Sequence, residues 1–228
     1  MQLPDGIIMT QAGVFVLEKD SHLSRWVEEH RRLDVAEKQI EFYSDKIKPG
    51  MVVLDAGACI GDHTETYRKL VGLSGTVWAL EPNPLTYEAL RLNFMACDNV
   101  MTRNVALSDY EGRTKMHQEV NVGASFLTPY GQISVDVTTI DALKFDRMDF
   151  IHLDCEGCEP KVLMGALHTI QRFKPVIVLE IAHNELARYG CNEKALIALI
   201  DSLGYSWREL EKHHGSHLPN RDIICLPK

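Results

Sequence analysis

The segment 51–64 constrains the fold of this chain more than any other stretch of its sequence. Four apolar or β-branched residues lead to Asp55, Gly57 and Gly61 follow it, and the polar residues 62–64 open a new periodic segment. This order is typical of a β-strand, a tight loop and the start of a helix. Glycines in such a loop let the backbone approach a ligand closely, and the amides at the helix start offer hydrogen-bond donors. Close packing of the helix against the strand is the alternative explanation for two glycines at this spacing.

A second apolar run lies downstream and ends at an acidic residue. Thr76–Leu80 is followed by Glu81, which stands twenty positions after Gly61. Mononucleotide-binding strand–helix–strand units place at this position the acid that accepts both hydrogen bonds of a ribose diol. The loop lacks the G-x-G-x-x-G spacing of dinucleotide-binding proteins, so the sequence does not favour a nucleotide-dependent dehydrogenase.

Four motifs along the chain resemble the FkbM-type S-adenosylmethionine-dependent methyltransferases. They are Val53–Thr64, Glu81–Pro84, Asn104–Ser108 and Leu153–Glu159, in the order of the family, and the similarity covers residues 45–185. The resemblance implies an α/β, Rossmann-like class I methyltransferase fold with a mostly parallel seven-stranded sheet, helices on both faces and a C-terminal antiparallel strand. It also implies S-adenosyl-L-methionine as cofactor and, most often, O-methylation of a hydroxyl on a sugar, polyketide or other small molecule.

The residues that we expect to bind the cofactor lie at the ends of the predicted strands. In related methyltransferases, the end of the third strand, here expected over Asn99–Leu107, lies against the adenine. The complete set of expected cofactor-binding residues is Asp55, Gly57, Gly61, His63, Thr64, Glu81, Asn83, Asn104, Val105, Ala106 and Asp154.

Two further predicted core strands also end in a carboxylate. The carboxylates are Asp154 and Glu180, and His183 follows Glu180 in the chain. Asp154 is expected opposite the glycine loop, where it would bind the methionine amino group, orient the acceptor hydroxyl or ligate a metal. As catalytic base we expect Asp154 first, then His183, then Glu180, since a histidine titrates near neutral pH. His152, inside the fourth core strand, is interpreted as a hydrogen-bonded structural residue.

Three carboxylates follow one another after the fourth core strand. Asp154, Glu156 and Glu159 should repel each other unless a cation, a proton or helix amides relieve the charge. Some metal-assisted O-methyltransferases bind a divalent metal with an Asp after strand four and an Asp-Asn pair after strand five. By this pattern, Asp154 with Glu180 or with residues 183–184 is a candidate divalent site. The match to that pattern is partial, so we assign no metal ligand.

A zinc site is a second metal alternative. Cys155 and Cys158 have C-x-x-C spacing, and His213, His214 and His217 supply further candidate ligands. No second C-x-x-C motif exists, and the histidines lie more than fifty residues away. We therefore interpret the two thiols as small buried packing groups.

The organisation is that of one domain over residues 1–228. We divide it into an N-terminal strand and helix segment (1–48), a cofactor-binding half (49–107), a β-rich insertion (108–147) and a C-terminal half (148–228). The insertion is recognised by glycines and prolines that separate short β-prone runs, and we expect it near the pocket, where it would select the acceptor.

The N-terminal segment contains a polar helical region, expected over 21–46 in one or two pieces. It either covers the cofactor mouth as a lid or merely covers a sheet edge. Its basic residues Arg25, Arg31 and Arg32 are interpreted as a solvated helix face, and the net charge of −8 argues against nucleic-acid binding. An RNA or protein methyltransferase with a basic groove around these arginines is the alternative function, as is a noncatalytic S-adenosylmethionine-binding module.

Membrane and secretory signals are absent from the sequence. The N-terminus has no basic region followed by an apolar one, and no run approaches eighteen apolar residues. With 45% apolar residues and six scattered cysteines, the chain is expected to be a folded cytoplasmic protein with reduced thiols and no membrane partner. Its expected partner is a hydroxyl-bearing small molecule, and the sequence leaves the subunit number open.

Overall fold

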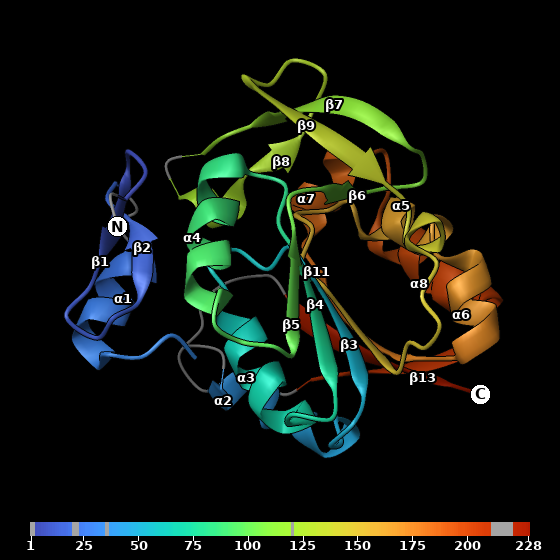
Figure 1. Cartoon of the computed structure of the whole chain (residues 1–228). Helices are drawn as coiled ribbons and strands as arrows, with labels where there is room; N and C mark the ends of the chain where they lie inside the picture. Colours follow the sequence, from blue (N-terminus) through green and yellow to red (C-terminus); the bar gives the residue numbers. More distant parts are fainter. Residues whose placement is uncertain (1–2, 20–22, 35–36, 120, 211–220) are drawn as a thin grey trace.

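The computed structural model describes residues 3–19, 23–34, 37–119, 121–210 and 221–228. A seven-stranded sheet forms the centre, helices cover both of its faces, and a smaller four-stranded sheet lies at its upper end in the view of Figure 1. A two-stranded hairpin near the N-terminus packs beside this body. Within the described ranges, no helix has the length and apolar character needed to cross a bilayer.

The seven-stranded sheet has the strand order β12-β13-β11-β10-β3-β4-β5. Strands β11, β10, β3, β4 and β5 are parallel, whereas β13 is antiparallel to both of its neighbours. The predicted fold class is therefore confirmed, including the C-terminal antiparallel strand. The strands are β3 (Val52–Ala56), β4 (Thr76–Leu80), β5 (Val100–Arg103), β10 (Phe150–Leu153), β11 (Val176–Ile181), β12 (Tyr205–Glu209) and β13 (Arg221–Pro227).

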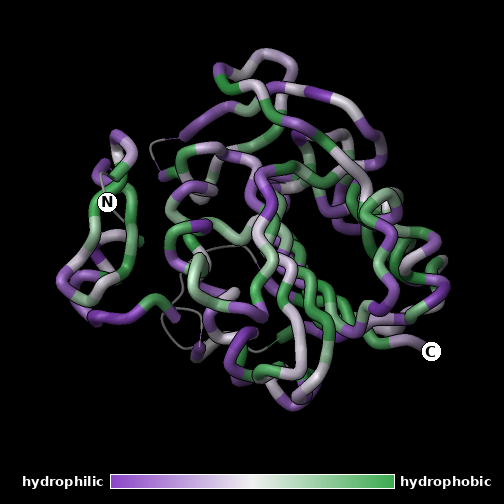
Figure 2. The backbone as a smooth tube through the Cα atoms, in the orientation of Figure 1, coloured by the Kyte–Doolittle hydropathy of each residue, from purple (hydrophilic) through white to green (hydrophobic). Residues whose placement is uncertain are grey.

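The central strands are apolar at nearly every position because both faces of the sheet are covered. Successive side chains of a strand point to opposite faces. Leu54 and Ile151 accordingly belong to the core cluster on one face, and Val53 and Phe150 to the cluster on the other. Figure 2 shows these hydrophobic stretches running through the middle of the molecule, with hydrophilic segments around them.

Helices divide between the two faces. The N-terminal elements, α3 and α4 contribute to the clusters on one face, and α5, α6 and α8 contribute to the cluster on the other. Helix α7 directly follows β11. The helices are α1 (Leu23–His30), α2 (Glu37–Ile40), α3 (Asp62–Val71), α4 (Pro84–Phe94), α5 (Glu159–Met164), α6 (Leu167–Phe173), α7 (His183–Arg188) and α8 (Glu193–Ser202), with short 3-10 turns η1 (Ser44–Lys46), η2 (Val122–Ala124) and η3 (Asp141–Leu143).

The four-stranded sheet has the order β6-β9-β7-β8. Its members are β6 (Ala106–Leu107), β7 (Gly112–His117), β8 (Phe126–Leu127) and β9 (Ile133–Thr138). The expectation of one strand over Asn99–Leu107 is wrong, because β5 and β6 belong to different sheets. Asn104 lies between them and its side-chain amide donates to the carbonyl oxygens of Glu81 (2.8 Å) and Pro82 (3.0 Å). These bonds hold the chain where it leaves the large sheet.

The N-terminal segment begins with the antiparallel hairpin β1 (Ile7–Met9) and β2 (Phe15–Leu17). Asn93 of α4 fixes this hairpin, since its side chain accepts from the Phe15 amide (2.7 Å) and donates to the Phe15 carbonyl (3.0 Å). The helical region expected over 21–46 is more fragmented than predicted: α1, α2 and η1 are separate pieces. Arg31, with a φ of 55°, has left-handed backbone directly after the last residue of α1.

Candidate active site

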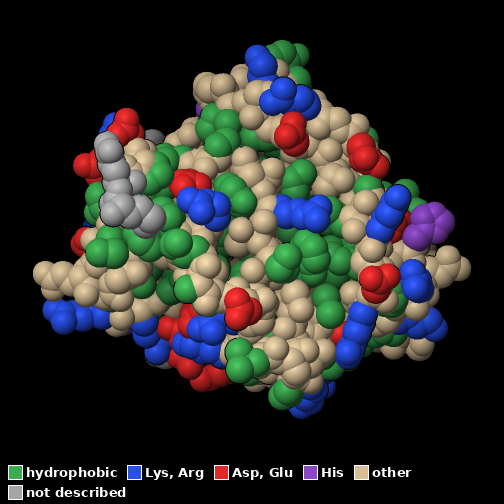
Figure 3. Space-filling model, in the orientation of Figure 1, with side chains coloured by type: hydrophobic (Ala, Val, Ile, Leu, Met, Phe, Trp, Pro, Cys, Tyr) green, Lys and Arg blue, Asp and Glu red, His purple; other side chains and the backbone are tan. Residues whose placement is uncertain are grey.

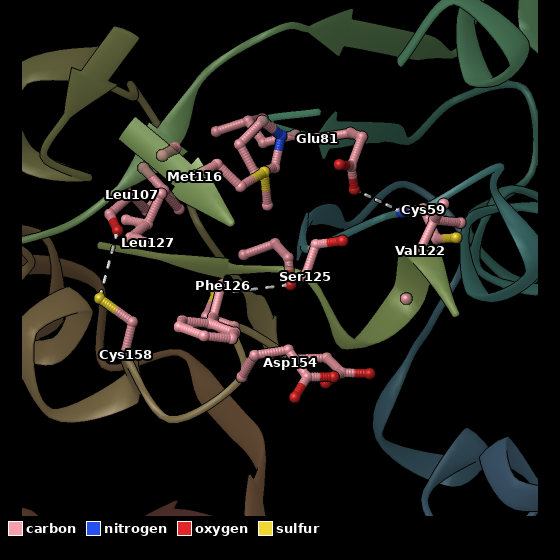
Figure 4. A pocket seen from close by; sticks show the side chains of 18 of the residues that line it. Cys59, Glu81, Leu107, Met116, Val122, Ser125, Phe126, Leu127, Asp154 and Cys158 are labelled. Atoms are coloured by element: carbon pink, nitrogen blue, oxygen red, sulfur yellow. Dashed lines mark hydrogen bonds between the residues drawn. The ribbon is translucent and has the colours of Figure 1, made fainter. Parts of the chain in front are cut away.

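A cavity of about 330 Å³ lies at the carboxyl ends of β3, β4 and β10. Parallel α/β sheets bind ligands at this edge, because the loops after the strands converge there. The segments 56–63, 80–82 and 154–158 contribute most of the polar wall. Figure 4 shows the side chains of Glu81 and Asp154 on opposite sides of the space. Ser125 and Phe126 lie between them in this view.

The two glycines of the loop after β3 serve different purposes. Gly57 lines the cavity at a φ of +84°, and a Cβ there would lie 1.9 Å from the carbonyl oxygen of Asp154. Gly61 does not line the cavity; with a φ of +103°, its added Cβ would lie 2.1 Å from the ring of Phe94. The first glycine therefore brings two strand ends together, and the second lets α4 pack against the loop, which is the packing explanation considered above.

Glu81 is a buried carboxylate held by two backbone amides. Its Oε2 accepts from the Cys59 amide (3.0 Å) and its Oε1 from the Asn83 amide (2.8 Å). Burial raises the pKa of Glu81 to about 7, and the two amide bonds oppose that rise only in part. Asn83 also caps α4 by accepting from the Leu85 amide (3.1 Å), so it supports the Glu81 loop from outside the cavity lining.

Asp55 and Thr64 form a buried support beneath the cavity and do not line it. The parallel register of β3 and β10 places Asp55 beside His152. The Asp55 carboxylate bonds to His152 Nδ1 (3.0 Å) and accepts from Thr64 Oγ1 (2.5 Å). His152 is 6% exposed, bonds to Asp55 and does not line the cavity, which is consistent with its interpretation as a hydrogen-bonded structural residue. This network fixes the first turn of α3 against the ends of two strands.

Asp62 and His63 at the start of α3 both line the cavity. His63 Nδ1 lies 3.3 Å from the Asp62 carboxylate, and its ring stacks on His152 with centroids 4.5 Å apart. Burial alone would lower the pKa of His63, but the carboxylates of Asp62, Asp55 and Asp154 outweigh it and raise that pKa to about 9. His63 is therefore a cation at neutral pH. Asp62 was not among the predicted site residues.

The three carboxylates after β10 lie in different environments. Asp154 and Glu156 line the cavity. Glu159 turns away from it and accepts from the Cys155 (2.9 Å) and Gly157 (3.3 Å) amides. Burial and the neighbouring Glu156 raise the pKa of Asp154 well above its usual value. Burial and nearby carboxylates raise the pKa of Glu156 to about 8, and burial raises that of Glu159 to about 7.

The structure does not bring Glu180 and His183 into the cavity lining. The His183 side chain is 55% exposed, and its Nε2 lies 3.4 Å from Glu193. Glu180 is at the end of β11, where it is paired in register with Asp222 of β13. Within the described ranges, no group of three histidine, cysteine, aspartate or glutamate side chains is arranged to hold a metal ion.

Of the two C-x-x-C cysteines, Cys158 is buried and Cys155 is half-buried, and both line the cavity. Cys158 is 1% exposed, and burial raises its pKa to about 12, which disfavours the thiolate that a zinc ion needs. Burial likewise raises the pKa of Cys155. The candidate ligands His213, His214 and His217 lie outside the described residues.

Apolar side chains make up most of the remaining described cavity wall. The expected cofactor-binding residues include two of them, Val105 and Ala106. Helix α1 contributes Leu23 and Trp26, and the β7, η2 and β8 region contributes a further wall. Val105 and Ala106 line the cavity between this region and Glu81, whereas Asn104 holds the adjoining loop. The apolar residues of the β7, η2 and β8 wall are Met116, Val122, Phe126 and Leu127.

The basic residues of the N-terminal segment do not line this cavity. Arg32 pairs with Glu37 and with Asp34 (3.2 Å), and Arg31 donates to Gln11 (3.3 Å). On the face drawn in Figure 3, lysine and arginine side chains are interspersed with acidic ones and do not gather in a groove. These arrangements do not favour the nucleic-acid alternative.

Comparison with known proteins places the chain in a family. Residues 55–207 match the family described as "Methyltransferase FkbM domain", which is more than half of the chain. The 2-O-methyltransferase NoeI of Sinorhizobium fredii (strain NBRC 101917 / NGR234) is 25% identical over 179 residues, covering 68% of this chain and 73% of NoeI.

Two solved structures show the same fold at lower identity. The FkbM methyltransferase from Methylobacillus flagellatus KT is 18% identical with a TM-score of 0.57; the match covers 77% of this chain and only 43% of that chain. An S-adenosylmethionine-dependent O-methyltransferase from Thermotoga maritima is 14% identical with a TM-score of 0.57, covering 98% of this chain and 78% of that one. Together with the match over residues 55–207, the strand order and the loops around Glu81 and Gly57 lead to one conclusion: this chain belongs to the FkbM family of S-adenosylmethionine-dependent methyltransferases.

Proposed function

We propose that this protein transfers the methyl group of S-adenosylmethionine to a hydroxyl oxygen of a small molecule. The observation that carries the proposal is the pair of carboxylates, Glu81 and Asp154, on opposite sides of one cavity at the carboxyl edge of the sheet. The 2-O-methyltransferase activity in the name of NoeI supports an oxygen acceptor. The resemblance to FkbM-type enzymes supports a sugar, polyketide or related hydroxyl.

The chemistry of the cavity fits the cofactor. Each Glu81 oxygen accepts one backbone hydrogen bond and keeps further acceptor capacity, as a ribose diol requires. Gly57 brings the backbone close to Asp154 without a side chain between them, which leaves the space in front of the loop open. Val105 and Ala106 line the wall next to Glu81, where they would contact the adenine.

The chain's own task is to orient the acceptor, exclude water and remove a proton. When bound, S-adenosylmethionine supplies an electrophilic methyl group on a sulfonium. Alignment of oxygen, carbon and sulfur is worth about 7 to 11 kcal/mol in well-oriented systems. Asp154 is the base that we propose, since burial raises its pKa toward the range in which a carboxylate takes a proton effectively, and removal of the hydroxyl proton adds about 10²- to 10⁴-fold.

His183 and Glu180 remain weaker proposals as the base, because they do not line the cavity. Asp154→Asn separates the two tasks of Asp154. We expect it to reduce methyl transfer by at least about 100-fold while S-adenosylhomocysteine, measured by calorimetry, binds nearly as tightly as before. Equal losses in binding and turnover would instead assign Asp154 to the cofactor, and no heat from the folded wild-type protein would refute the proposed function.

A further inference from the structure

The cavity has two halves of contrasting chemistry. One half is made by the loops after β3, β4 and β10, and it carries all the acidic and basic side chains among the described lining residues. Four of these five are carboxylates and no lysine or arginine is present. The charged lining residues are Asp62, His63, Glu81, Asp154 and Glu156.

The other half offers few hydrogen bonds. It is lined by Leu23 and Trp26 of α1 and by the apolar wall of β7, η2 and β8. Its described polar side chains are Asn121 and Ser125, and Ser125 Oγ already accepts from the Glu119 amide (3.2 Å). A ligand part with many hydroxyls would lose its bonds to water there without replacing them.

Contacts from α7 and from the residue after it hold the apolar wall in place. The hydroxyl of Tyr189 accepts from the Leu127 amide and donates to the Leu127 carbonyl, both at 3.1 Å. The guanidinium of Arg188 lies 4.2 Å from the ring centroid of Phe126. The centroid of the His117 ring lies 5.2 Å from the same Phe126 centroid. Figure 4 shows Phe126 directly beside Asp154. Contacts within the protein therefore hold the apolar surface next to the proposed base in place.

We propose that the acceptor is an uncharged alcohol or phenol whose apolar ring lies against Phe126 and Val122, with its hydroxyl directed at Asp154. This rests on the proposed function and narrows its substrate class.

Among the described lining residues the one cationic side chain is His63, which is already paired with Asp62 (3.3 Å). Arg188 contacts Phe126 without lining the cavity. A phosphate, sulfate or carboxylate on the acceptor would therefore lie among acidic side chains without an unpaired cation in the lining to balance it. The charge of the lining thus disfavours sugar nucleotides and nucleic acids, and its apolar half disfavours free sugars. Of the acceptor classes considered above, aromatic and polyketide-like hydroxyls fit best.

Three probes separate these classes in the full chain saturated with S-adenosylhomocysteine. Naphthalenediol is uncharged and apolar, hydroxynaphthalenesulfonate replaces one hydroxyl by an anion, and methyl glucoside is an uncharged polyol. Calorimetry should show naphthalenediol binding at least about tenfold more tightly than either of the others. The inference is wrong if the sulfonate or the glucoside binds as tightly as the diol, or if none of the three binds.

Two substitutions test the position of the acceptor. Phe126→Ala should weaken naphthalenediol binding about tenfold and leave the affinity for S-adenosylhomocysteine unchanged. Val122→Lys should strengthen binding of the sulfonate about tenfold, because it adds a cation to the apolar wall. The matched control is Tyr130→Ala, an aromatic residue of the same region that is 91% exposed, which should change neither affinity.

The outcomes of these experiments also separate the two proposals. An equal loss of diol and S-adenosylhomocysteine binding in Phe126→Ala would assign the wall to the cofactor and overturn the inference, with the methyltransferase function intact. Val122→Lys without a gain for the sulfonate would overturn it as well. Absence of heat from S-adenosylhomocysteine in the wild-type protein would overturn the proposed function, and this inference with it.

Discussion

Gly57 is the position where the addition of one methyl group should do measurable damage to both stability and the cofactor site. Its φ is +84°, and an added Cβ would lie 1.9 Å from the carbonyl oxygen and 2.9 Å from the carbonyl carbon of Asp154. These are backbone atoms of the neighbouring strand end, so they cannot rotate away as a side chain would. Gly57→Ala must therefore separate the ends of β3 and β10.

The size of the effect can be worked out from two contributions. Left-handed backbone costs an alanine about 1 to 2 kcal/mol. Overpacking against fixed atoms adds about 1 to 3 kcal/mol. Gly190 is the matched control, because its φ is +70° but no heavy atom lies within 4 Å of its added Cβ. Gly190→Ala should therefore show the backbone contribution alone.

Urea unfolding of the two variants beside the wild type measures the difference. We expect the free energy of unfolding to fall by about 2 to 5 kcal/mol in Gly57→Ala and by about 1 to 2 kcal/mol in Gly190→Ala. Calorimetry with S-adenosylhomocysteine should show weaker binding in Gly57→Ala alone, since the displaced Asp154 belongs to the cavity wall. Equal free-energy losses in the two variants would refute the reasoning, because the contact with Asp154 would then contribute nothing.

Three further perturbations test other parts of the structure. Glu81 has a pKa of about 7, and hydrogen bonds from the ribose favour its charged form, so cofactor binding should release a proton from this side chain. Calorimetry of S-adenosylhomocysteine at pH 7 in buffers of different ionisation enthalpy should detect the release. Glu81→Gln should abolish it. Tyr189→Phe removes both hydrogen bonds to the Leu127 backbone and should lower the free energy of unfolding by about 1 to 3 kcal/mol, whereas an unchanged urea midpoint would contradict their contribution. Burial raises the pKa of Glu159 from 4.5 to about 7, so the native state binds more protons between these values and its stability should fall as pH rises through them; Glu159→Gln should flatten that slope in urea titrations at pH 5 and pH 7.

The sequence predicts those parts of the site that depend on strand ends. Asp55, Glu81 and Asp154 each follow or close an apolar run, and parallel pairing of β3 with β4 and β10 necessarily brings such ends to one edge. The pattern does not tell which carboxylate faces the cavity. Asp55 is the acidic residue of β3, and its side chain bonds to His152 and Thr64 beneath the cavity. It does so because the strand register places His152 beside it.

Loop conformation and long-range packing account for what the sequence pattern misses. Cys59 and Glu156 have positive φ values, 49° and 53°. Neither is a glycine or asparagine, so the sequence does not indicate left-handed backbone there, and each one changes the direction of a cavity-lining loop. Phe126 lines the cavity and is contacted by Arg188, which lies far along the chain, and by His117 of β7. His183 has the right chemistry and follows the right strand, but the start of α7 carries it to the surface.

The antiparallel strand β13 has a consequence for the order in which the molecule assembles. Strand β12 pairs with the sheet only through β13, although β12 precedes it in the chain by more than ten residues. Until residues 221–227 insert, β12 has nowhere to dock and α8 lacks the strand on which it packs. We therefore expect this edge to consolidate last during folding, and a substitution that prevents β13 from inserting should release two strands and one helix together.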